Sequence, residues 1–278
     1  MKPIYSIIVL LSKLTYAQPP QAPDGKKWVL NKEMSDEFEG NTLDESKWQK
    51  EPLGNDWNWD GRAPGLFKSN NVVVKDGKMN ITVSKLDAPV VKNGKTFTHQ
   101  GGIVRSVQAG KVGMYFEAKM KANKTVMSST FWLMSKYNCG KKLELDIQEC
   151  VGTITDKTED WAKKWDQIFH ANAIHRETTC NPKSKRVQKQ FTPETKNYER
   201  FYTYGAWWKS STEILFYLDG KYTFTLNPTV EWDVPAFIQM AIETYDWNPI
   251  PAGGGLVEHG TWQERTTQYD WVRTWELK

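Results

Sequence analysis

The sequence predicts an all-β protein in which antiparallel sheets form a sandwich. Many short strand-like segments end at turn dipeptides, such as Asp76-Gly77, Asn93-Gly94 and Asp219-Gly220, which favour two-residue hairpin turns. Aromatic residues make up 13% of the 278-residue chain and include 14 tryptophans, a composition typical of β structure. Because no shift in composition divides the chain, we expect one large domain.

The expected strands follow one another along most of the chain. Only residues 157–164 and 194–199 have the character of brief helices. In a sandwich, one face of a sheet covers the core, and a concave, aromatic opposite face would form a cleft suited to a polymer. Strands are expected at residues 71–74, 79–83, 113–120, 131–134, 143–147, 168–175, 202–208, 213–218, 223–226, 237–242 and 269–275.

The first 17 residues have the features of a secretory signal peptide. Lys2 provides a basic start, an apolar run extends from Ile4 to Leu11, and the small residue Ala17 precedes a proline-rich stretch. The apolar run is too short to span a membrane, and no later segment reaches 18 apolar residues. We therefore expect cleavage after Ala17, a mature domain of residues 18–278, secretion or export to the periplasm, and no membrane partner.

Charge and cysteine content give no support to a nucleic-acid partner or a thiolate metal site. The formal net charge is only +4 at pH 7. The three cysteines, Cys139, Cys150 and Cys180, permit at most one disulfide and lack the paired spacing of a zinc site. We expect no nucleic-acid partner, no required cofactor, and a monomer.

An acidic cluster lies on one of the predicted strands. The run Leu143-Glu144-Leu145-Asp146-Ile147 alternates strictly, so its apolar side chains should face the core and its two carboxylates the opposite side. Simple alternation would place Gln148 next on the carboxylate face, whereas a β-bulge would bring Glu149 there instead. The sequence therefore predicts a bulged strand with three acids on one face.

Hydrolysis of a glycosidic bond gives a chemical reason for three carboxylates that repel one another. A retaining glycosidase needs one ionised carboxylate to attack the anomeric carbon and one protonated carboxyl to release the leaving oxygen, and like charges push two pKa values apart. We assign Glu144 as the nucleophile, Glu149 as the general acid and then base, and Asp146 as the residue that orients Glu144. The alternatives are a solvated acidic strand, a calcium site and a non-catalytic carbohydrate-binding module.

Several further passages match one known family in order along the chain. They are Asp36-Glu37-Phe38 with Trp48, Gly113–Ala122, Phe131-Trp132-Leu133, Tyr202-Thr203-Tyr204 with Trp208, Phe216–Gly220 and Tyr269–Trp275. With the acidic cluster, these passages resemble glycoside hydrolase family 16, in its subgroup with a bulged catalytic strand, over nearly everything after residue 17. The resemblance implies a β-jelly-roll sandwich, endo-acting hydrolysis with retention, and the roles given above to the three acids. One departure is Tyr202, where the family often has His.

Two passages look closest to the family's hydrolases of red-algal galactans, the porphyranases and agarases. They are Trp57–Gly65 and Ile147–Gly152. The resemblance implies hydrolysis of β-1,4 linkages in the sulfated galactan porphyran, with neutral agarose as the alternative substrate. The family often holds a structural calcium on its convex side, for which Gly40 and Asp270 are the candidate positions.

Arginines near the acids are candidates for binding sulfate, since the planar guanidinium holds oxygens in pairs. Arg62 lies close to Trp57 and Trp59 in the sequence and is the first candidate for a sulfate subsite. Its alternative role is a surface ion pair with Asp60. Arg105 is a second candidate, on a strand where a solvated arginine is the alternative.

Aromatic and polar residues complete the expected cleft. Trp59 and Trp132 are candidate platforms for the apolar face of a sugar ring, with a core role as the alternative for Trp132. Alternation places His170 and His175 on opposite faces of one strand without showing which face lines the cleft, and His175 better matches the family's cleft histidine. Glu243 is a candidate contact to sugar hydroxyls, or a solvated acid at a strand end.

Overall fold

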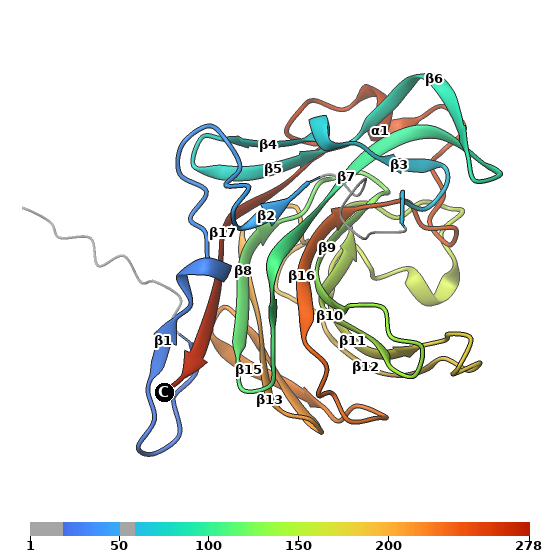
Figure 1. Cartoon of the computed structure of the whole chain (residues 1–278). Coiled ribbons are helices and arrows are strands. Elements are labelled where there is room, and N and C mark those ends of the chain that lie inside the picture. Colours follow the sequence, from blue (N-terminus) through green and yellow to red (C-terminus); the bar gives the residue numbers. More distant parts are fainter. Residues whose placement is uncertain (1–18, 51–58) are drawn as a thin grey trace, which may run out of the picture.

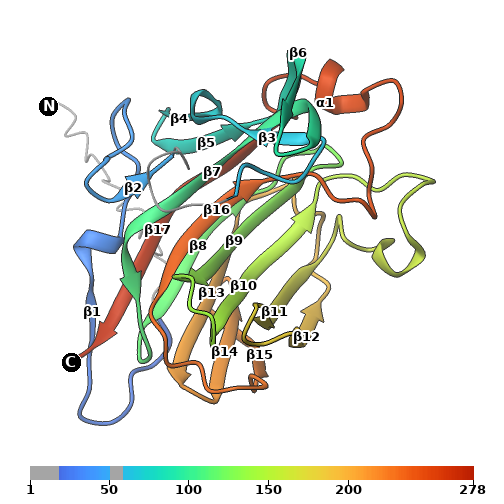
Figure 2. The same cartoon turned by 45° about the vertical axis from the view of Figure 1, so that its right-hand side comes forward.

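The computed structural model describes residues 19–50 and 59–278, which form two antiparallel β-sheets packed face to face (Figure 1). We call them the outer sheet and the cleft sheet. Figure 2 shows the cleft sheet nearer the viewer, with the outer sheet behind it. The sequence prediction of an all-β sandwich is confirmed, and the expected signal peptide lies outside the described residues.

The outer sheet contains eight strands. Seven strands follow one another across this sheet, and one short strand near the start of the described chain pairs with the last strand of the sequence. In that order the strands are β15 (Lys221–Leu226), β14 (Glu213–Leu218), β13 (Tyr202–Ser210), β8 (Tyr115–Lys121), β17 (Thr266–Leu277), β5 (Lys78–Thr82) and β4 (Val72–Lys75), with β1 (Trp28–Leu30) beside β17.

The cleft sheet contains nine strands, most of them from the middle of the chain. In spatial order they are β12 (Lys185–Phe191), β11 (Phe169–Arg176), β10 (Lys142–Val151), β9 (Ser128–Ser135), β16 (Ala236–Ile242), β7 (Lys95–Gly110) and β2 (Trp48–Gln49). Two more strands join β7, the parallel β3 (Gly65–Phe67) and the antiparallel β6 (Ser84–Lys92). Strands distant in sequence thus lie side by side across this sheet.

The three turn dipeptides close hairpins, as the sequence predicts. Asp76-Gly77 joins β4 to β5, Asn93-Gly94 joins β6 to β7, and Asp219-Gly220 joins β14 to β15. All six residues have φ between 50° and 75°. Both central positions of a type I′ turn require this left-handed conformation, which Asn, Asp and Gly tolerate best.

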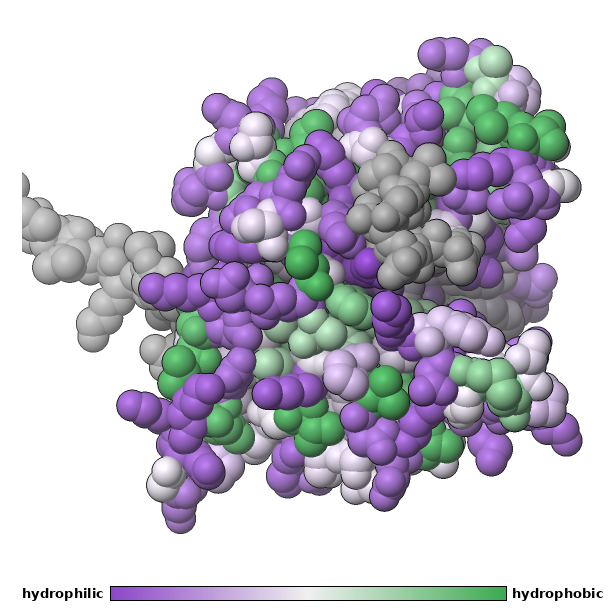
Figure 3. Space-filling view, in the orientation of Figure 1, coloured by the Kyte–Doolittle hydropathy of each residue, from purple (hydrophilic) through white to green (hydrophobic). Residues whose placement is uncertain are grey.

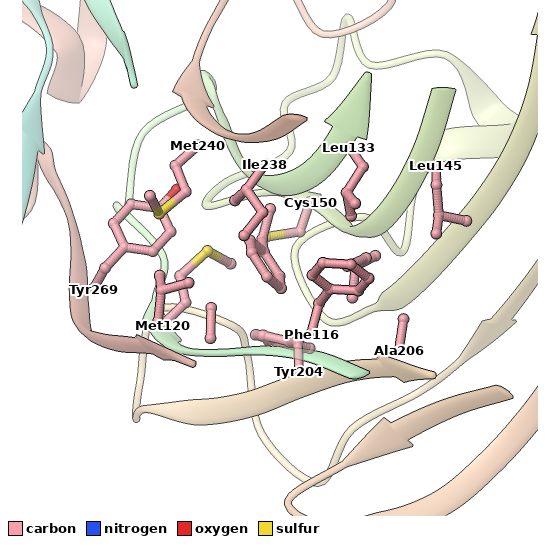
Figure 4. Packing of buried hydrophobic residues seen from close by; sticks show 14 of the residues in the cluster. Phe116, Met120, Leu133, Leu145, Cys150, Tyr204, Ala206, Ile238, Met240 and Tyr269 are labelled. Atoms are coloured by element: carbon pink, nitrogen blue, oxygen red, sulfur yellow. The ribbon is translucent and has the colours of Figure 1, made fainter. Parts of the chain in front are cut away.

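The hydrophobic core fills the space between the two sheets (Figure 4). On β8, Phe116 and Met120 point inward and are fully buried, as two-residue alternation requires. They belong to the same cluster as Leu133 and Leu145 from the cleft sheet. The apolar face of β10 is thereby fixed against the core, and its other face is left for the cleft.

The structure departs from the prediction where strands are polar and helices short. The expected strands form, but β1, β2, β3, β6, β7 and β12 are not among them. β12 is an edge strand of mainly exposed polar residues, which lack an alternating apolar pattern. Residues 157–164 contain only the 3₁₀ turn η3 (Asp160–Ala162), and residues 194–199 form no helix. The single-turn helix α1 (Gly255–His259) was also missed, because one turn shows no periodicity.

The surface of the described chain is mainly hydrophilic on the face seen in Figure 3, where hydrophobic side chains form small separate groups. Among the described residues, no helix has the length and apolar character needed to cross a membrane.

Candidate active site

The acidic strand β10 contains the predicted bulge. Its pairing with β9 shifts by one residue between Asp146 and Gln148, so that Ile147 is an extra residue without a partner of its own. Ile147 and Gln148 are both fully buried, and the Gln148 amide donates to a backbone carbonyl on the core side. Two consecutive inward side chains turn Glu149 to the same face as the two preceding acids.

All three acids line one cleft of about 660 Å³ on the open face of the cleft sheet. Strands β7, β9, β10, β11 and β16 supply its floor, and loop residues around Gly61 and Tyr245 form part of its wall. Within the described residues, six basic and four acidic side chains line the cleft, so basic groups outnumber acidic ones there. They are Arg62, Lys95, Arg105, Lys136, Lys142 and Arg176, facing Glu144, Asp146, Glu149 and Glu243.

Glu144 is paired with an arginine that sequence reasoning missed. Arg176, the last residue of β11, donates from Nε to Oε2 of Glu144 at 2.8 Å and from Nη2 to Oε1. Burial lowers the pKa of Arg176, but the charge and hydrogen bonds of Glu144 outweigh burial and raise it. Arg176 therefore stays charged and occupies both oxygens of Glu144.

Glu149 is surrounded by groups that favour its ionised form. The Tyr245 hydroxyl donates to its Oε1 at 2.6 Å, and Nδ1 of His170 lies 3.3 Å from its Oε2. Burial alone would raise the pKa of Glu149, but His170, Tyr245 and the charge of Arg62 together lower it. These three groups therefore favour the carboxylate form of Glu149.

Asp146 lies between the two glutamates on the same face and is 7% exposed. Burial raises its pKa, and the negative charges of Glu144 and Glu149 raise it further, well above the ordinary value. The expected separation of carboxyl pKa values is therefore present, but the raised pKa belongs to Asp146 rather than to Glu149. Of Asp146 and Glu149, Asp146 is the one whose surroundings favour the protonated form.

Arg62 and Glu243 form a second arginine–carboxylate pair in the cleft. Nε of Arg62 donates to Oε2 of Glu243 at 2.8 Å, whereas Asp60, the alternative partner, binds Nζ of Lys92 at 2.5 Å. The surface pair expected as the alternative for Arg62 is thus absent. Burial raises the pKa of Glu243 to about 7, although Arg62 lowers it in part.

Trp59 and Trp132 meet edge to face at the floor of the cleft. Their ring centroids are 6.0 Å apart with planes at 74°, and Trp132 lies directly across from Asp146 in the β9–β10 register. Trp132 is 6% exposed and packs in a small cluster with Phe67, so it combines a core role with a cleft edge. Trp57, the neighbouring candidate, lies outside the described residues.

Arg105 lines the cleft from β7, beyond Trp132. Its Nη2 donates to Oε1 of Gln49 at 3.0 Å, and its guanidinium lies 4.8 Å from the ring centroid of Phe237. These contacts hold the side chain in place rather than leaving it solvated, as the alternative role assumed.

His175 does not line the cleft, contrary to its role among the expected substrate contacts. It lies opposite the core residue Leu143 in the β10–β11 register, and its ring contacts the carbonyl of Gly140 and the amide of Asn181. The histidine on the same side of the sheet as the acids is the buried His170, whose Nδ1 lies 3.3 Å from Oε2 of Glu149. The sequence signal for this choice was available, since Phe169, Ala171 and Ala173 are the core positions of β11 and direct the intervening residues to the opposite face of the sheet.

An aromatic array supports the Glu149 end of the cleft and was also missed. Tyr245 stacks on Trp247 with centroids 4.6 Å apart, and Trp165 contacts both Trp247 and His170. Trp161 adds an exposed edge to the array at 62% exposure. These rings come from β11, η3 and the loop after β16, so only the fold brings them together.

Calcium binding at the candidate positions Gly40 and Asp270 stays a prediction. The carboxylate of Asp270 lies 2.8 Å from Nζ of Lys119 and 4.0 Å from Nζ of Lys78, and two ammonium groups would oppose a cation there. The described residues contain no group of three or more His, Cys, Asp or Glu side chains that could hold a metal ion.

Comparison with known proteins shows the family to which the chain belongs. A family model described as the GH16 domain of β-porphyranases A–D matches residues 28–277. The chain is 42% identical to β-porphyranase B of Zobellia galactanivorans, over 99% of this chain and 96% of that protein. It is 36% identical to β-porphyranase B of Phocaeicola plebeius, over 93% and 87%. The crystal structure of porphyranase B from Z. galactanivorans superposes with a TM-score of 0.86 at 43% identity, covering 93% of this chain and 96% of that one. The chain therefore belongs to glycoside hydrolase family 16, in the group of β-porphyranase A–D domains.

Proposed function

We propose that this glycoside hydrolase is a secreted, endo-acting, retaining β-porphyranase that cleaves β-1,4 linkages of porphyran. The proposal is carried by the cleft face of β10, where three carboxylates share one open groove with six basic side chains. Porphyran is a sulfated galactan, and a groove lined by arginine and lysine suits its sulfate groups. Relatives named β-porphyranase support the choice of substrate.

The two glutamates divide the reaction between them. Glu144 attacks the anomeric carbon as the bond to the leaving oxygen breaks, and Glu149 gives its proton to that oxygen. Glu149 then takes a proton from water, whose oxygen displaces Glu144 from the glycosyl intermediate. Two displacements at the same carbon retain its configuration.

The surroundings of Asp146 favour its protonated form and those of Glu149 favour its carboxylate form, so Glu149 must gain a proton before it acts as an acid. The side chain of Glu149 is still 20% exposed. A sugar that displaces the remaining water removes the solvation of the charged form and raises the pKa of Glu149. A protonated Asp146 can donate to Glu144 and so orient the nucleophile.

The choice between porphyran and neutral agarose is tested by the products. Purified protein is incubated with porphyran and with agarose of equal chain length, and the oligosaccharides are quantified. We expect release from porphyran and much slower release from agarose. Replacement of Arg62 with Met should reduce kcat/KM for porphyran by about tenfold, because one charged hydrogen bond to sulfate is lost. Products from agarose alone would favour a β-agarase.

The assignment of nucleophile and acid is tested by chemical rescue. Azide is added to Glu144→Gly and Glu149→Gly enzymes with an activated aryl glycoside as substrate. We expect an inverted glycosyl azide from the first variant and a retained one from the second, because azide replaces the nucleophile in one case and the incoming water in the other. The reverse pattern would exchange the two roles.

A non-catalytic carbohydrate-binding module is the alternative of a different class. Carbohydrate binding alone would not require two glutamates and a buried aspartate with a raised pKa on one face of a strand. Glu144→Gln should lose turnover and keep oligosaccharide binding, as measured by calorimetry. Unchanged release of sugar by this variant would remove Glu144 from the mechanism.

A further inference from the structure

We propose that Arg176 is a latch on the nucleophile and that a sulfate group of the substrate releases it. This proposal rests on the proposed function, in which Glu144 attacks the sugar and the substrate is sulfated. In this proposal Arg176 selects the substrate by controlling the rate of bond cleavage, in addition to any contribution to binding.

The resting geometry blocks the nucleophile. Arg176 binds both oxygens of Glu144 at once, through Nε at 2.8 Å and through Nη2. A carboxylate in a two-point pair with guanidinium has its charge compensated and its oxygens directed at hydrogen atoms. Attack on an anomeric carbon needs one oxygen free, so Arg176 must loosen at least one contact before the bond forms.

The two partners differ in their freedom to move. The side chain of Arg176 is 43% exposed, whereas that of Glu144 is 8% exposed. Glu144 also lies on β10, which is hydrogen-bonded to a strand on each side. Arg176 is also the last residue of β11, and its register pair with Lys142 is the last one between β10 and β11. The arginine is thus the member of the pair that can turn away.

The surroundings supply a place for an anion. Lys142 lies directly opposite Arg176 in the β10–β11 register, and both line the cleft together with Lys136. A sulfate entering this end of the cleft meets a positive group of side chains. It offers Arg176 the same two-point geometry as a carboxylate, so the arginine exchanges one anion for another without losing hydrogen bonds.

The consequence is selection through kcat. A neutral galactan brings no anion to replace Glu144, so Arg176 stays on the nucleophile and turnover is slow even when the sugar binds. Interactions made only on the way to the transition state alter kcat, whereas uniform binding alters KM alone. Arg62, whose partner Glu243 is not the nucleophile, should alter mainly KM.

The first experiment compares Arg176→Met, Arg176→Lys and the matched control Lys142→Met on porphyran and on chemically desulfated porphyran. For Arg176→Met we expect kcat on the desulfated polymer to rise by about tenfold, the scale of one charged hydrogen-bonded contact, while kcat/KM on porphyran falls. Arg176→Lys should lie between wild type and Met. Lys142→Met should weaken porphyran binding without raising kcat on the desulfated polymer. Equal losses on both polymers for Arg176→Met would overturn the latch.

The second experiment measures the nucleophile directly and does not depend on porphyran hydrolysis. A neutral epoxyalkyl galactoside alkylates a free catalytic carboxylate, and mass spectrometry locates the label. We expect Glu144 to be labelled about tenfold faster in Arg176→Met than in wild type. Equal rates would overturn the proposal. Faster labelling in an enzyme that cleaves no porphyran would uphold the latch and reject the proposed substrate. Melting curves show that the variants compared are folded.

Discussion

Tyr245 shows how a single hydroxyl can set the ionisation of a catalytic carboxyl. It donates to Glu149 at 2.6 Å, and its own pKa is raised well above the usual value, chiefly by burial and then by the charge of Glu149. A hydroxyl that stays protonated is a permanent donor, and a permanent donor stabilises the carboxylate form. The acid of the proposed mechanism is therefore held in its basic state until substrate arrives.

Tyr245→Phe removes this donor without changing the ring. The pKa of Glu149 should rise, so that Glu149 keeps its proton to a higher pH. The basic limb of the kcat/KM profile, which requires protonated Glu149, should move to higher pH, as measured with soluble oligosaccharides from pH 4 to 10. Tyr222→Phe, an exposed position on β15, is the control. A shift to lower pH would contradict the role given to Tyr245.

The positions of site residues could be predicted where they depend on the pattern within one strand. They could not be predicted where they depend on the register between two strands. The alternation of the run at 143–147 was sufficient to place Glu144 and Asp146 in the cleft, and to require a bulge for Glu149. The pairing of Arg176 with Glu144 depends on the register between β10 and β11, which no pattern within either strand determines. The Trp165–Trp247 contact depends on loops for the same reason.

At the scale of elements, a disulfide secures the Glu144 end of the cleft. Cys139, between β9 and β10, is bonded to Cys180, between β11 and β12, while Cys150 stays free and buried in the core. The sequence allowed one bridge among three possible pairs, and the fold selects this one. The bridge connects the loops that flank β10 and β11, the two strands that carry Glu144 and Arg176.

Replacing both bridged cysteines with serine should lower the free energy of unfolding by about 4 kcal/mol, the loop-entropy cost for a bridge that closes about 40 residues. Urea denaturation of wild type and variant measures the difference. A reductant should lower the stability of wild type and leave that of the double variant unchanged. A wild type that is insensitive to reductant would show that the bridge contributes little.

Across the whole molecule, strands were predicted best where apolar and polar residues alternate strongly. All eleven expected strands form, because each has one face in the common core. The longest strand, β7, was missed since it crosses from the core to the edge, where it pairs with β6 and β3 and its pattern changes along its length. Tertiary context decides such strands.

Glu117 makes the stability of the whole fold depend on pH. It is fully buried on β8, where Nε1 of Trp275 donates to one of its oxygens at 2.9 Å and the other has no hydrogen-bond partner within the described residues. Burial raises its pKa from 4.5 to about 7. Since the unfolded chain releases this proton at lower pH, the group's contribution is full below pH 4.5 and is lost as pH rises through 7.

We expect the melting temperature to fall between pH 5 and pH 8, and to fall less in Glu117→Gln. The effect of this carboxyl on the free energy of unfolding is at most roughly 3 kcal/mol. Glu243, whose pKa is also raised to about 7, adds a fall over the same range. Scanning calorimetry at several pH values measures both, with exposed Glu45→Gln as the control. An identical pH dependence in wild type and Glu117→Gln would contradict this account.

Because Ile147 has no partner on β9, the sequence motif alone is not enough to transfer the three acids to another protein. The six residues from Glu144 to Glu149, grafted onto a regular strand of another sandwich, would send Gln148 into the groove and bury the last carboxylate. The smallest unit that can be transplanted is the strand together with a neighbour whose register accepts one residue too many, as β9 does. A new hydrolase designed on a β-sandwich scaffold would therefore need the register shift between the two strands as well as the amino-acid sequence of the motif.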